Sequence, residues 1–335
     1  MSFKVFVFSD EIVAGKYQFE MEKLQKLFAQ RDILCKELLF FSCATDLFWQ
    51  KIESEIGKEN LLVFLSNAKI DGIIYQNFAK LGQFEKTVDE QALVFGKDDK
   101  KTIIMPYDVD YLSMLEKILE KPVGRKVITL QIFGKRDEEI EKKLSLLGQE
   151  FEDLRYTYFS SNLVSKLYLS YKSVQEGIDS KQVALSLPFQ DCLFSESELT
   201  LTNCVLKLLR LKNITLSIVD CFTGGQIIEN FYNDCDNFDD AVKSYRIDKT
   251  TSALTSEMVY QMAVEERKLG SDICLCIDGR ESEKGSEVIF SIASKNDVSI
   301  FKNTFSIKGQ KARAMSANSA LYHLFRKLKQ NDFAF

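Results

Sequence analysis

Short apolar runs alternate with amphipathic helical patterns along this chain, and this alternation limits it to a small set of folds. In the first part of the chain, helical spacing of apolar residues recurs at 19–32 and 110–121. Strands that alternate with helices indicate a parallel α/β sheet. The runs that read as strands are "FKVFVFS" (3–9), "LCKELLFFS" (34–42), "NLLVFLS" (60–66) and "KTIIMP" (101–106).

The same alternation of strands and helices returns after residue 195. A module with a different order of elements lies between the first and the last part of the chain. In this middle part, a strand at 125–134 and a charged helix at 135–148 precede two alternating segments, 164–174 and 181–189, that read as strands. The sequence therefore predicts an α/β protein in which two three-layer α/β domains are joined by a small α+β module. The expected boundaries are 1–122, 123–194 and 195–335.

The last part of the chain supplies a complete set of expected elements. Strands are predicted at 214–220 and 271–279, and two further runs separated by "KND" predict a hairpin. The expected helices are 197–213, 225–232, 255–270 and 313–329, and the expected hairpin strands are 287–294 and 298–307.

Charge and hydropathy remove several classes of partner. The 44 basic and 49 acidic residues give a net charge of −5, and no Lys/Arg-rich stripe stands out, so nucleic acid is not an expected partner. No apolar run is long enough to span a bilayer and no signal peptide is evident, so we expect a cytoplasmic protein without a membrane partner. The eight cysteines show no framework spacing and read as reduced thiols, and no metal or cofactor site is expected.

A single histidine, His323, restricts the possible catalytic machinery. Any Ser-His or Cys-His pair would have to use it. It lies within a late helical pattern, where we expect a residue at the surface or edge of a helix. If the chain has a nucleophile, its base is therefore expected to be Lys, Tyr or a carboxylate.

The stretch "SIVDCFTGGQIIENF" (217–231) combines a strand, a sharp glycine turn and the start of a helix. Such a layout can aim a side chain and several backbone N–H groups at a ligand. Cys221 follows the strand, and its thiol has two interpretations. It could be a nucleophile activated by the helix start, or a small buried residue beside a turn.

With these motifs in order, the chain resembles the CinA (competence/damage-inducible protein A) family. That resemblance implies a molybdenum-cofactor-biosynthesis-like N-terminal domain, a KH-like middle module and a C-terminal nicotinamide-nucleotide amidohydrolase-like domain. It rests most on "SEMVYQMAVEERKLGSDICLCIDG" and "VIFSIAS", and less on "FVFSDEIVAGK" and "ITLQIFGKRDEEIEKKL". The implied activity is hydrolysis of the carboxamide of nicotinamide mononucleotide, and the implied assembly is an oligomer, here expected as a homodimer.

The resemblance also suggests roles for individual residues. Cys221 stands at the position of the family's nucleophilic serine, Lys249 matches the family lysine, and Tyr245 lies one residue after the family tyrosine position, which holds Ser244. Asp278 replaces a family threonine before a retained glycine. The residues expected to contact substrate are Thr223, Gly224, Gly225, Asp278 and Arg280.

The N-terminal domain departs further from the family pattern. Glu11 and Gly15 match its first motif, but the glycine-rich phosphate loop is replaced by "LVFLSNAKIDGII". Changes in both end domains leave three alternatives open. The chain could be a non-catalytic descendant that binds a pyridine nucleotide or a related small molecule, an amidohydrolase that uses Cys221, or a new enzyme on the same scaffold.

Overall fold

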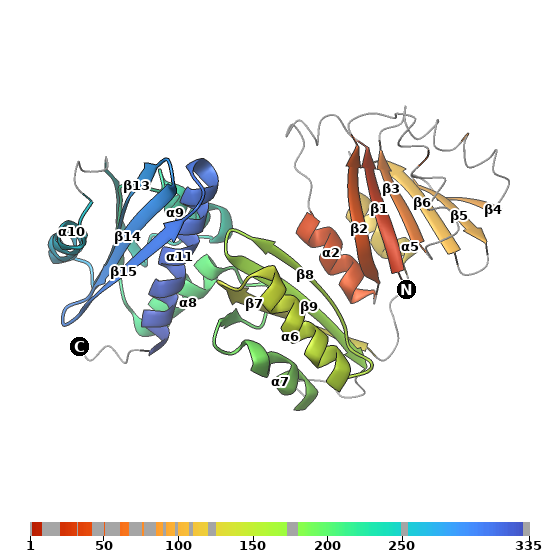
Figure 1. Ribbon diagram of the computed structural model, residues 1–335, viewed down its shortest axis with the longest axis horizontal. Helices are drawn as coiled ribbons and strands as arrows, with labels where there is room; N and C mark the ends of the chain where they lie inside the picture. The colour runs from red at the N-terminus through yellow and green to blue at the C-terminus, as the bar shows by residue number, and fades with distance from the viewer. Residues whose placement is uncertain are drawn as a thin grey trace. The chain divides into compact units, whose positions relative to one another are not determined.

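The computed structural model describes residues 2–8, 21–31, 33–41, 50, 61–66, 76, 85–89, 92–97, 100–106, 110–119, 125–172, 180–248 and 254–330. Three sheets account for its strands, and helices pack on them (Figure 1). This confirms the predicted α/β class. None of the helices in these ranges has both the length and the apolar character needed to cross a membrane.

The first sheet has the strand order β2-β1-β3-β6-β5-β4. Neighbours in the run β2-β1-β3-β6 are parallel, whereas β5 is antiparallel to both β6 and β4. Its strands are β1 (Ser2–Phe8), β2 (Leu34–Phe41), β3 (Leu61–Ser66), β4 (Glu85–Asp89), β5 (Ala92–Lys97) and β6 (Lys100–Pro106). The two strands β4 and β5 are not among those predicted from the sequence.

Helices α2 (Met21–Gln30) and α5 (Tyr111–Ile118) pack on one face of this sheet through an apolar cluster. Asp110 begins α5, because its side chain accepts a hydrogen bond from the N–H of Ser113 at 3.1 Å. At the other end of the pair, buried Arg31 donates from Nε to the carbonyl of Leu119 at 2.9 Å. The two helices predicted at 19–32 and 110–121 are thus confirmed as α2 and α5.

The middle sheet has the order β10-β7-β9-β8. Two positive-φ residues, Asn162 and Leu163, connect β8 to β9, as a tight two-residue turn requires. The elements of this part are β7 (Arg125–Phe133), α6 (Asp137–Glu150), β8 (Arg155–Ser161), β9 (Val164–Lys172), α7 (Ser180–Ser186), a 3₁₀ turn η1 (Leu187–Phe189) and β10 (Leu193–Ser195).

The prediction of a strand at 181–189 is wrong, since this segment forms α7 and η1. Its apolar residues alternate, but Val183 and Leu187 are 52% and 59% exposed, whereas Leu185 and Phe189 are fully buried. In a strand these four side chains would all lie on one face, whereas in a helix residues two apart point in different directions and residues four apart share a face.

The last sheet has the order β12-β11-β13-β14-β15. The run β12-β11-β13 is parallel, and β14 is antiparallel to both neighbours. The predicted hairpin is confirmed as β14 and β15; β12, a mostly exposed edge strand, was not predicted. The strands are β11 (Leu216–Asp220), β12 (Val242–Ile247), β13 (Ile273–Ser282), β14 (Gly285–Ala293) and β15 (Val298–Phe305).

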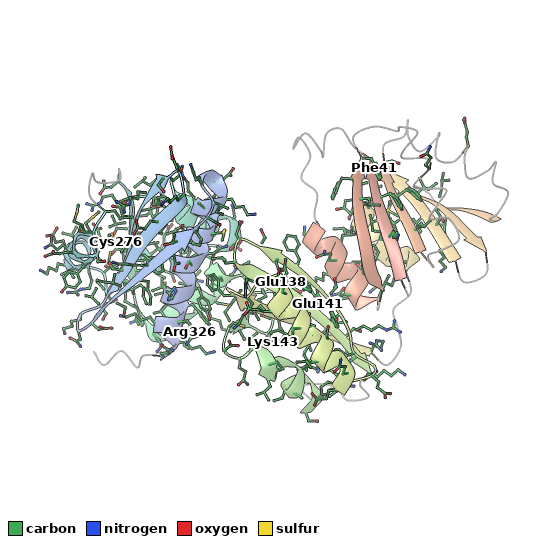
Figure 2. The ribbon with its side chains drawn as sticks, viewed as in Figure 1. Phe41, Glu138, Glu141, Lys143, Cys276 and Arg326 are labelled. Carbon is green, nitrogen blue, oxygen red and sulfur yellow. The ribbon has the colours of Figure 1, made fainter. Side chains whose placement is uncertain are left out.

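Helices cover both faces of this last sheet (Figure 1). One face packs on α8 (Leu201–Lys212), α9 (Gln226–Asp234) and α11 (Gly309–Gln330). The other face packs on α10 (Ser256–Lys268), and Cys276 of β13 belongs to this second cluster (Figure 2). Alternate residues of β11 therefore enter different cores.

The chain also divides into two compact units, each of which is discontinuous in sequence. The first comprises 1–128, 144–159 and 167–185, and the second comprises 129–143, 160–166 and 186–335. The predicted domain boundaries near 122 and 194 stay predictions.

Candidate functional site

The candidate site lies where the parallel strands of the last sheet end. Asp220, the final residue of β11, pairs with Ile247 of β12 and Ile277 of β13. The backbone extends this alignment by one residue, because Cys221 N–H donates to the Ile277 carbonyl at 2.8 Å and Asp248 N–H donates to the Asp220 carbonyl at 3.0 Å. Ligands of open α/β sheets commonly bind at this edge.

The turn after β11 depends on its two glycines. Gly224 and Gly225 have φ of 69° and 98°, a left-handed conformation that side chains other than glycine rarely adopt. Gly225 is the N-cap of α9, and its carbonyl accepts the N–H of Glu229 at 2.9 Å. The predicted sequence of strand, glycine turn and helix start is confirmed.

The carboxyl group of Asp220 lies inside this turn and is completely buried. Its Oδ1 accepts hydrogen bonds from the N–H of Phe222 at 3.1 Å and of Thr223 at 2.7 Å. Its Oδ2 accepts from Gly225 N–H at 3.0 Å, from Tyr245 Oη–H at 2.9 Å and from Thr223 Oγ1–H. The amides of Thr223 and Gly225, predicted to contact substrate, are thus hydrogen-bonded to a side chain of the protein itself.

Tyr245 joins Asp220 from the neighbouring strand. Tyr245 packs against the core formed with α8, α9 and α11, and the preceding Ser244 faces the other way, where its hydroxyl donates to Glu266 of α10 at 3.1 Å. Burial, with Asp220 as the second cause, raises the pKa of Tyr245 far above its usual value. This phenol therefore keeps its proton and does not supply a base.

Cys221 lies on the opposite face of the sheet from Tyr245. Its thiol is only 6% exposed and belongs to the apolar cluster beneath α10, together with Val219 and Cys276. Burial, followed by the nearby carboxyl groups of Asp278, Asp248 and Asp220, raises the pKa of this thiol to about 12. A nucleophilic cysteine needs the reverse shift, because the thiolate is the reactive form.

The remaining predicted site residues are Asp278 and Arg280, both on β13, and Lys249. Asp278 is buried on β13, and its Oδ1 accepts the N–H of Gly279 at 2.8 Å. Arg280 lies in an exposed part of the same strand and donates to Glu287 of β14 at 2.6 and 2.9 Å. The ion pair holds Arg280 on the strand surface. Lys249 lies outside the described residues.

Thr223, Gly225 and Tyr245 are therefore brought together around one carboxyl group, while Cys221 and Asp278 lie on the other face. Asp220, which organises the turn, is not among the site residues predicted from the sequence. An available signal was an acid at the end of a buried strand, followed at once by turn residues whose amides need acceptors.

A pocket of about 350 Å³ lies next to the glycine turn, and Gln226, the residue after Gly225, is part of its lining. Its lining is rich in side-chain amides, and we name it the amide-lined pocket. Asn318 of α11 donates to the carbonyl of Asn162 at 3.0 Å, which fixes one wall. The lining residues are Asn162, Gln226, Asn230, Gln310, Lys311, Ala314 and Asn318.

Arg313 approaches the turn from the same helix that supplies Lys311. A Cβ built on Gly224 would lie 3.3 Å from Arg313 Nη1, so the guanidinium is close to the turn backbone. In the part of the chain that the structure describes, no group of three or more His, Cys, Asp or Glu side chains is arranged to hold a metal ion.

Comparisons with known proteins give structural neighbours only. No family model matches the sequence, and no curated protein matches it. A competence or damage-inducible protein from Enterobacter asburiae is 17% identical, with a TM-score of 0.34, over 38% of this chain and 98% of its own. A CinA superfamily protein from Enterobacter cloacae is 18% identical, with a TM-score of 0.35, over 41% of this chain and 96% of its own.

The CinA protein from Thermoplasma acidophilum is more distant, at 13% identity and a TM-score of 0.29, over 36% of this chain and 98% of its own. The structural neighbours named here are all CinA or competence/damage-inducible proteins. Each of them matches less than half of this chain.

Proposed function

We propose that this chain is a non-catalytic, CinA-like protein whose C-terminal domain binds a nucleotide instead of hydrolysing it. One observation carries the proposal. The Asp220 carboxyl group accepts hydrogen bonds from the amides of Thr223 and Gly225, and those amides are the donors that an oxyanion would need. An acceptor already present in the protein competes with any oxyanion that develops during a reaction.

The surroundings of Cys221 support the same proposal. Amide hydrolysis needs a nucleophile and a group that takes its proton. The thiol is buried with a pKa of about 12, and the Tyr245 hydroxyl donates to Asp220 from the other face of the sheet. In this proposal the chain shares the strand and the turn with an amidohydrolase, but its side chains lack a reactive arrangement.

The amide-lined pocket is the place we assign to the nucleotide. Its volume of about 350 Å³ lies within the range of small-molecule sites, roughly 300–1,000 Å³. Side-chain amides both donate and accept hydrogen bonds, as the edge of a base or a ribose requires. Lys311 supplies the positive charge that a phosphate group requires.

Two measurements on the full-length protein test this proposal. The first is ammonia release from nicotinamide mononucleotide, and the second is thermal stabilisation of the protein by the same compound. We expect no ammonia, and we expect a stabilisation that Lys311→Gln reduces. The matched control is Lys284→Gln, which removes the same charge from the exposed turn between β13 and β14.

The possible outcomes separate the alternatives. Ammonia release that disappears in Cys221→Ala would overturn the non-catalytic assignment and establish the amidohydrolase. Stabilisation that is equal in both lysine variants would overturn the assignment of the pocket. Absence of both ammonia and stabilisation would reject binding of nicotinamide mononucleotide, the nucleotide that the resemblance implies.

A further inference from the structure

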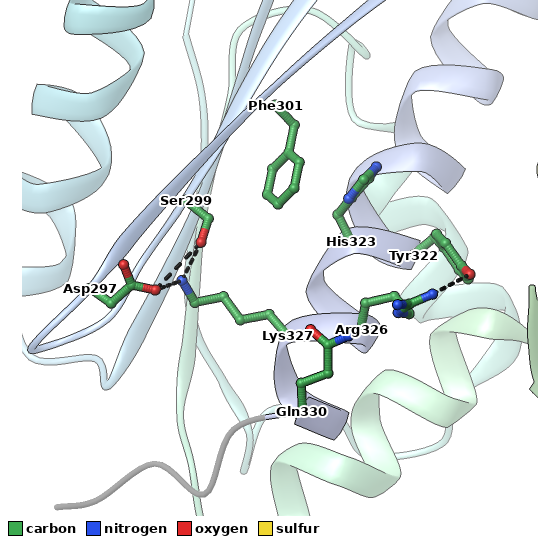
Figure 3. Close-up of a pocket in the computed structure, with 8 residues that line it drawn as sticks. All are labelled: Asp297, Ser299, Phe301, Tyr322, His323, Arg326, Lys327 and Gln330. Atoms are coloured by element: carbon green, nitrogen blue, oxygen red, sulfur yellow. Dashed lines mark hydrogen bonds and ion pairs between the residues drawn. The ribbon is translucent and has the colours of Figure 1, made fainter. Parts of the chain in front are cut away.

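A second pocket, of about 390 Å³, lies against β15 and the final turns of α11 (Figure 3). We name it the α11 pocket. It shares no residue with the amide-lined pocket, and the proposed function above makes no use of it. Its lining residues are Asp297, Ser299, Phe301, Tyr322, His323, Arg326, Lys327 and Gln330.

One of its two cations is already neutralised. Lys327 is buried, and its Nζ donates to Asp297 Oδ2 at 2.6 Å, to Ser299 Oγ at 2.7 Å and to the Ile292 carbonyl at 3.4 Å. Figure 3 shows this side chain directed toward Asp297 and Ser299. Lys327 therefore fixes one side of the pocket and carries no unbalanced charge into it.

The other cation, Arg326, has only neutral acceptors. Its Nη1 donates to the Asp191 carbonyl at 3.1 Å and to the Tyr322 hydroxyl at 3.4 Å. The carboxylate of Asp191 pairs instead with Lys135 at 2.7 Å and Lys143 at 3.6 Å. Within the described ranges, no acidic side chain lies within ion-pair distance of Arg326.

Two contacts through Nη1 orient the guanidinium of Arg326 and leave its other edge for a ligand. The Nε–H and Nη2–H groups share that edge, and their spacing matches the two oxygens of a carboxylate or phosphate. Arg326 projects from the last turns of α11 (Figure 2). An arginine held through one nitrogen in this way is pre-organised, which lowers the entropy cost of binding an anion.

Aromatic rings form the wall beside this arginine. The ring of His323 lies 4.1 Å from that of Phe301 and 5.2 Å from that of Phe290, measured between ring centroids. Burial lowers the pKa of His323, and the positive charge of Arg326 lowers it further. At neutral pH the imidazole is therefore uncharged, and the charged groups of the pocket are Arg326, Lys327 and Asp297.

We propose that the α11 pocket binds a small organic anion that carries a planar ring. The anionic group, a carboxylate or a phosphate monoester, pairs with the unused edge of Arg326, and the ring packs on the Phe301–His323 wall. The excess positive charge of the pocket favours anions over cations, and its aromatic wall favours a planar ligand over a bare inorganic anion. The volume suits a ligand no larger than a mononucleotide.

His323 makes the test direct, because it is the only histidine in the chain and its imidazole NMR signals need no further assignment. The probes are benzoate, AMP, adenosine and inorganic phosphate, each titrated into the full-length protein. We expect benzoate, AMP or both to move the His323 signals and to raise the pKa of His323, because a bound anion offsets the charge of Arg326. Adenosine and phosphate, each lacking one half of the recognised chemistry, should bind more weakly.

Two substitutions identify the residue that recognises the anion. Arg326→Gln should weaken binding of the aromatic anion by roughly 10- to 100-fold, since it removes a charge-assisted hydrogen-bonded pair. Arg326→Lys keeps the charge without the fork and should give an intermediate affinity. The matched control, Arg136→Gln, removes an arginine that is 80% exposed at the start of α6 and should leave the titration unchanged.

The thermal midpoint of each variant shows whether it remains folded. If Arg326→Gln does not fold, the affinity of Arg326→Lys is compared with that of the wild type instead. Equal binding by wild type and Arg326→Gln would overturn the proposal. It would also be overturned if neither benzoate nor AMP moved the His323 signals, or if inorganic phosphate bound as tightly as the tighter of these two ligands. Benzoate and AMP together distinguish a carboxylate ligand from a phosphate ligand.

Discussion

At the end of β11, two adjacent residues meet opposite environments. Asp220 faces the α9 side, where five hydrogen bonds converge on its carboxyl oxygens, whereas the next residue, Cys221, faces the apolar cluster under α10. Successive side chains of a strand point to opposite faces, and the parallel alignment continues through Cys221. A single step along the backbone therefore separates the polar centre of the turn from the thiol.

The first prediction at this scale concerns the reactivity of Cys221. Its pKa of about 12 means that iodoacetamide at pH 8 should modify it far more slowly than a thiol of the unfolded chain, whose pKa is about 8.5. Roughly a thousandfold less thiolate is present at that pH. Mass spectrometry of native and urea-unfolded samples measures both rates, and comparable rates would contradict the buried thiol.

The second prediction concerns Asp220. Asp220→Asn places an amide donor opposite backbone donors in a fully buried turn, so it should lower the free energy of unfolding by at least about 2 kcal/mol. Asp239→Asn, at an exposed position, is the control and should change stability by no more than about 0.5 kcal/mol. Urea unfolding measures both. Equal stability of the two variants would mean that the hydrogen bonds of Asp220 contribute little.

At the scale of elements, the close approach of the turn to β13 depends on a glycine. A Cβ built on Gly279 would lie 2.6 and 2.7 Å from atoms of the Phe222 ring and 3.0 Å from the Glu287 carbonyl oxygen. Phe222 is only 8% exposed, so its ring has little space into which it can move. The residue after Cys221 thus packs directly on the backbone of β13.

We therefore expect Gly279→Ala to destabilise the protein by about 1–3 kcal/mol, as overpacking typically does. The cost should fall in a Phe222→Ala background, because the clashing ring is then absent. Gly148→Ala in helix α6 is the control: its Cβ would meet only Tyr156 at 4.0 Å, so helix propensity should make it stabilising. A double-mutant cycle by thermal unfolding gives the coupling, and additive effects would argue against the contact.

At the scale of the whole molecule, the buried cysteines together make the free energy of unfolding depend on pH. Burial is the main cause that raises the pKa of Cys192 and Cys235 to about 11 and of Cys221 and Cys274 to about 12. Each of these thiols is protonated in the folded chain at pH values where the unfolded chain has begun to lose its protons. The folded state then binds more protons than the unfolded state.

Because the folded state binds more protons, stability is expected to decrease at alkaline pH. Stability should be unaffected by these thiols below about pH 8.5, and it should fall as the pH rises from there through 11 to 12, the folded pKa values. Differential scanning calorimetry at pH 7.5 to 10.5 measures the midpoint, and Cys221→Ala should flatten the decline. A midpoint that is constant across this interval would contradict the prediction.

Much of the fold follows from local periodicity. The helices that pack on the last sheet and the hairpin β14–β15 lie close to their predicted bounds, because their apolar spacing is regular and long enough to show its period. The edge strand β12, whose side chains are mostly exposed, carries no such signal and was missed. The apolar pattern at 181–189 fits both the period of a strand and that of a helix. Only the burial of its side chains distinguishes the two.

The strand, the glycine turn and the helix start at 216–234 could be predicted from local residues, because glycine and apolar spacing act over a few residues. Which side chains meet at this turn depends instead on contacts between segments that are distant in the sequence. Asp220 finds the hydroxyl of Tyr245, 25 residues away, whereas the neighbouring Cys221 enters the opposite core. Hydrogen bonds and burial between distant segments depend on the register of neighbouring strands, and that register is set by how the complete sheet and its helices pack.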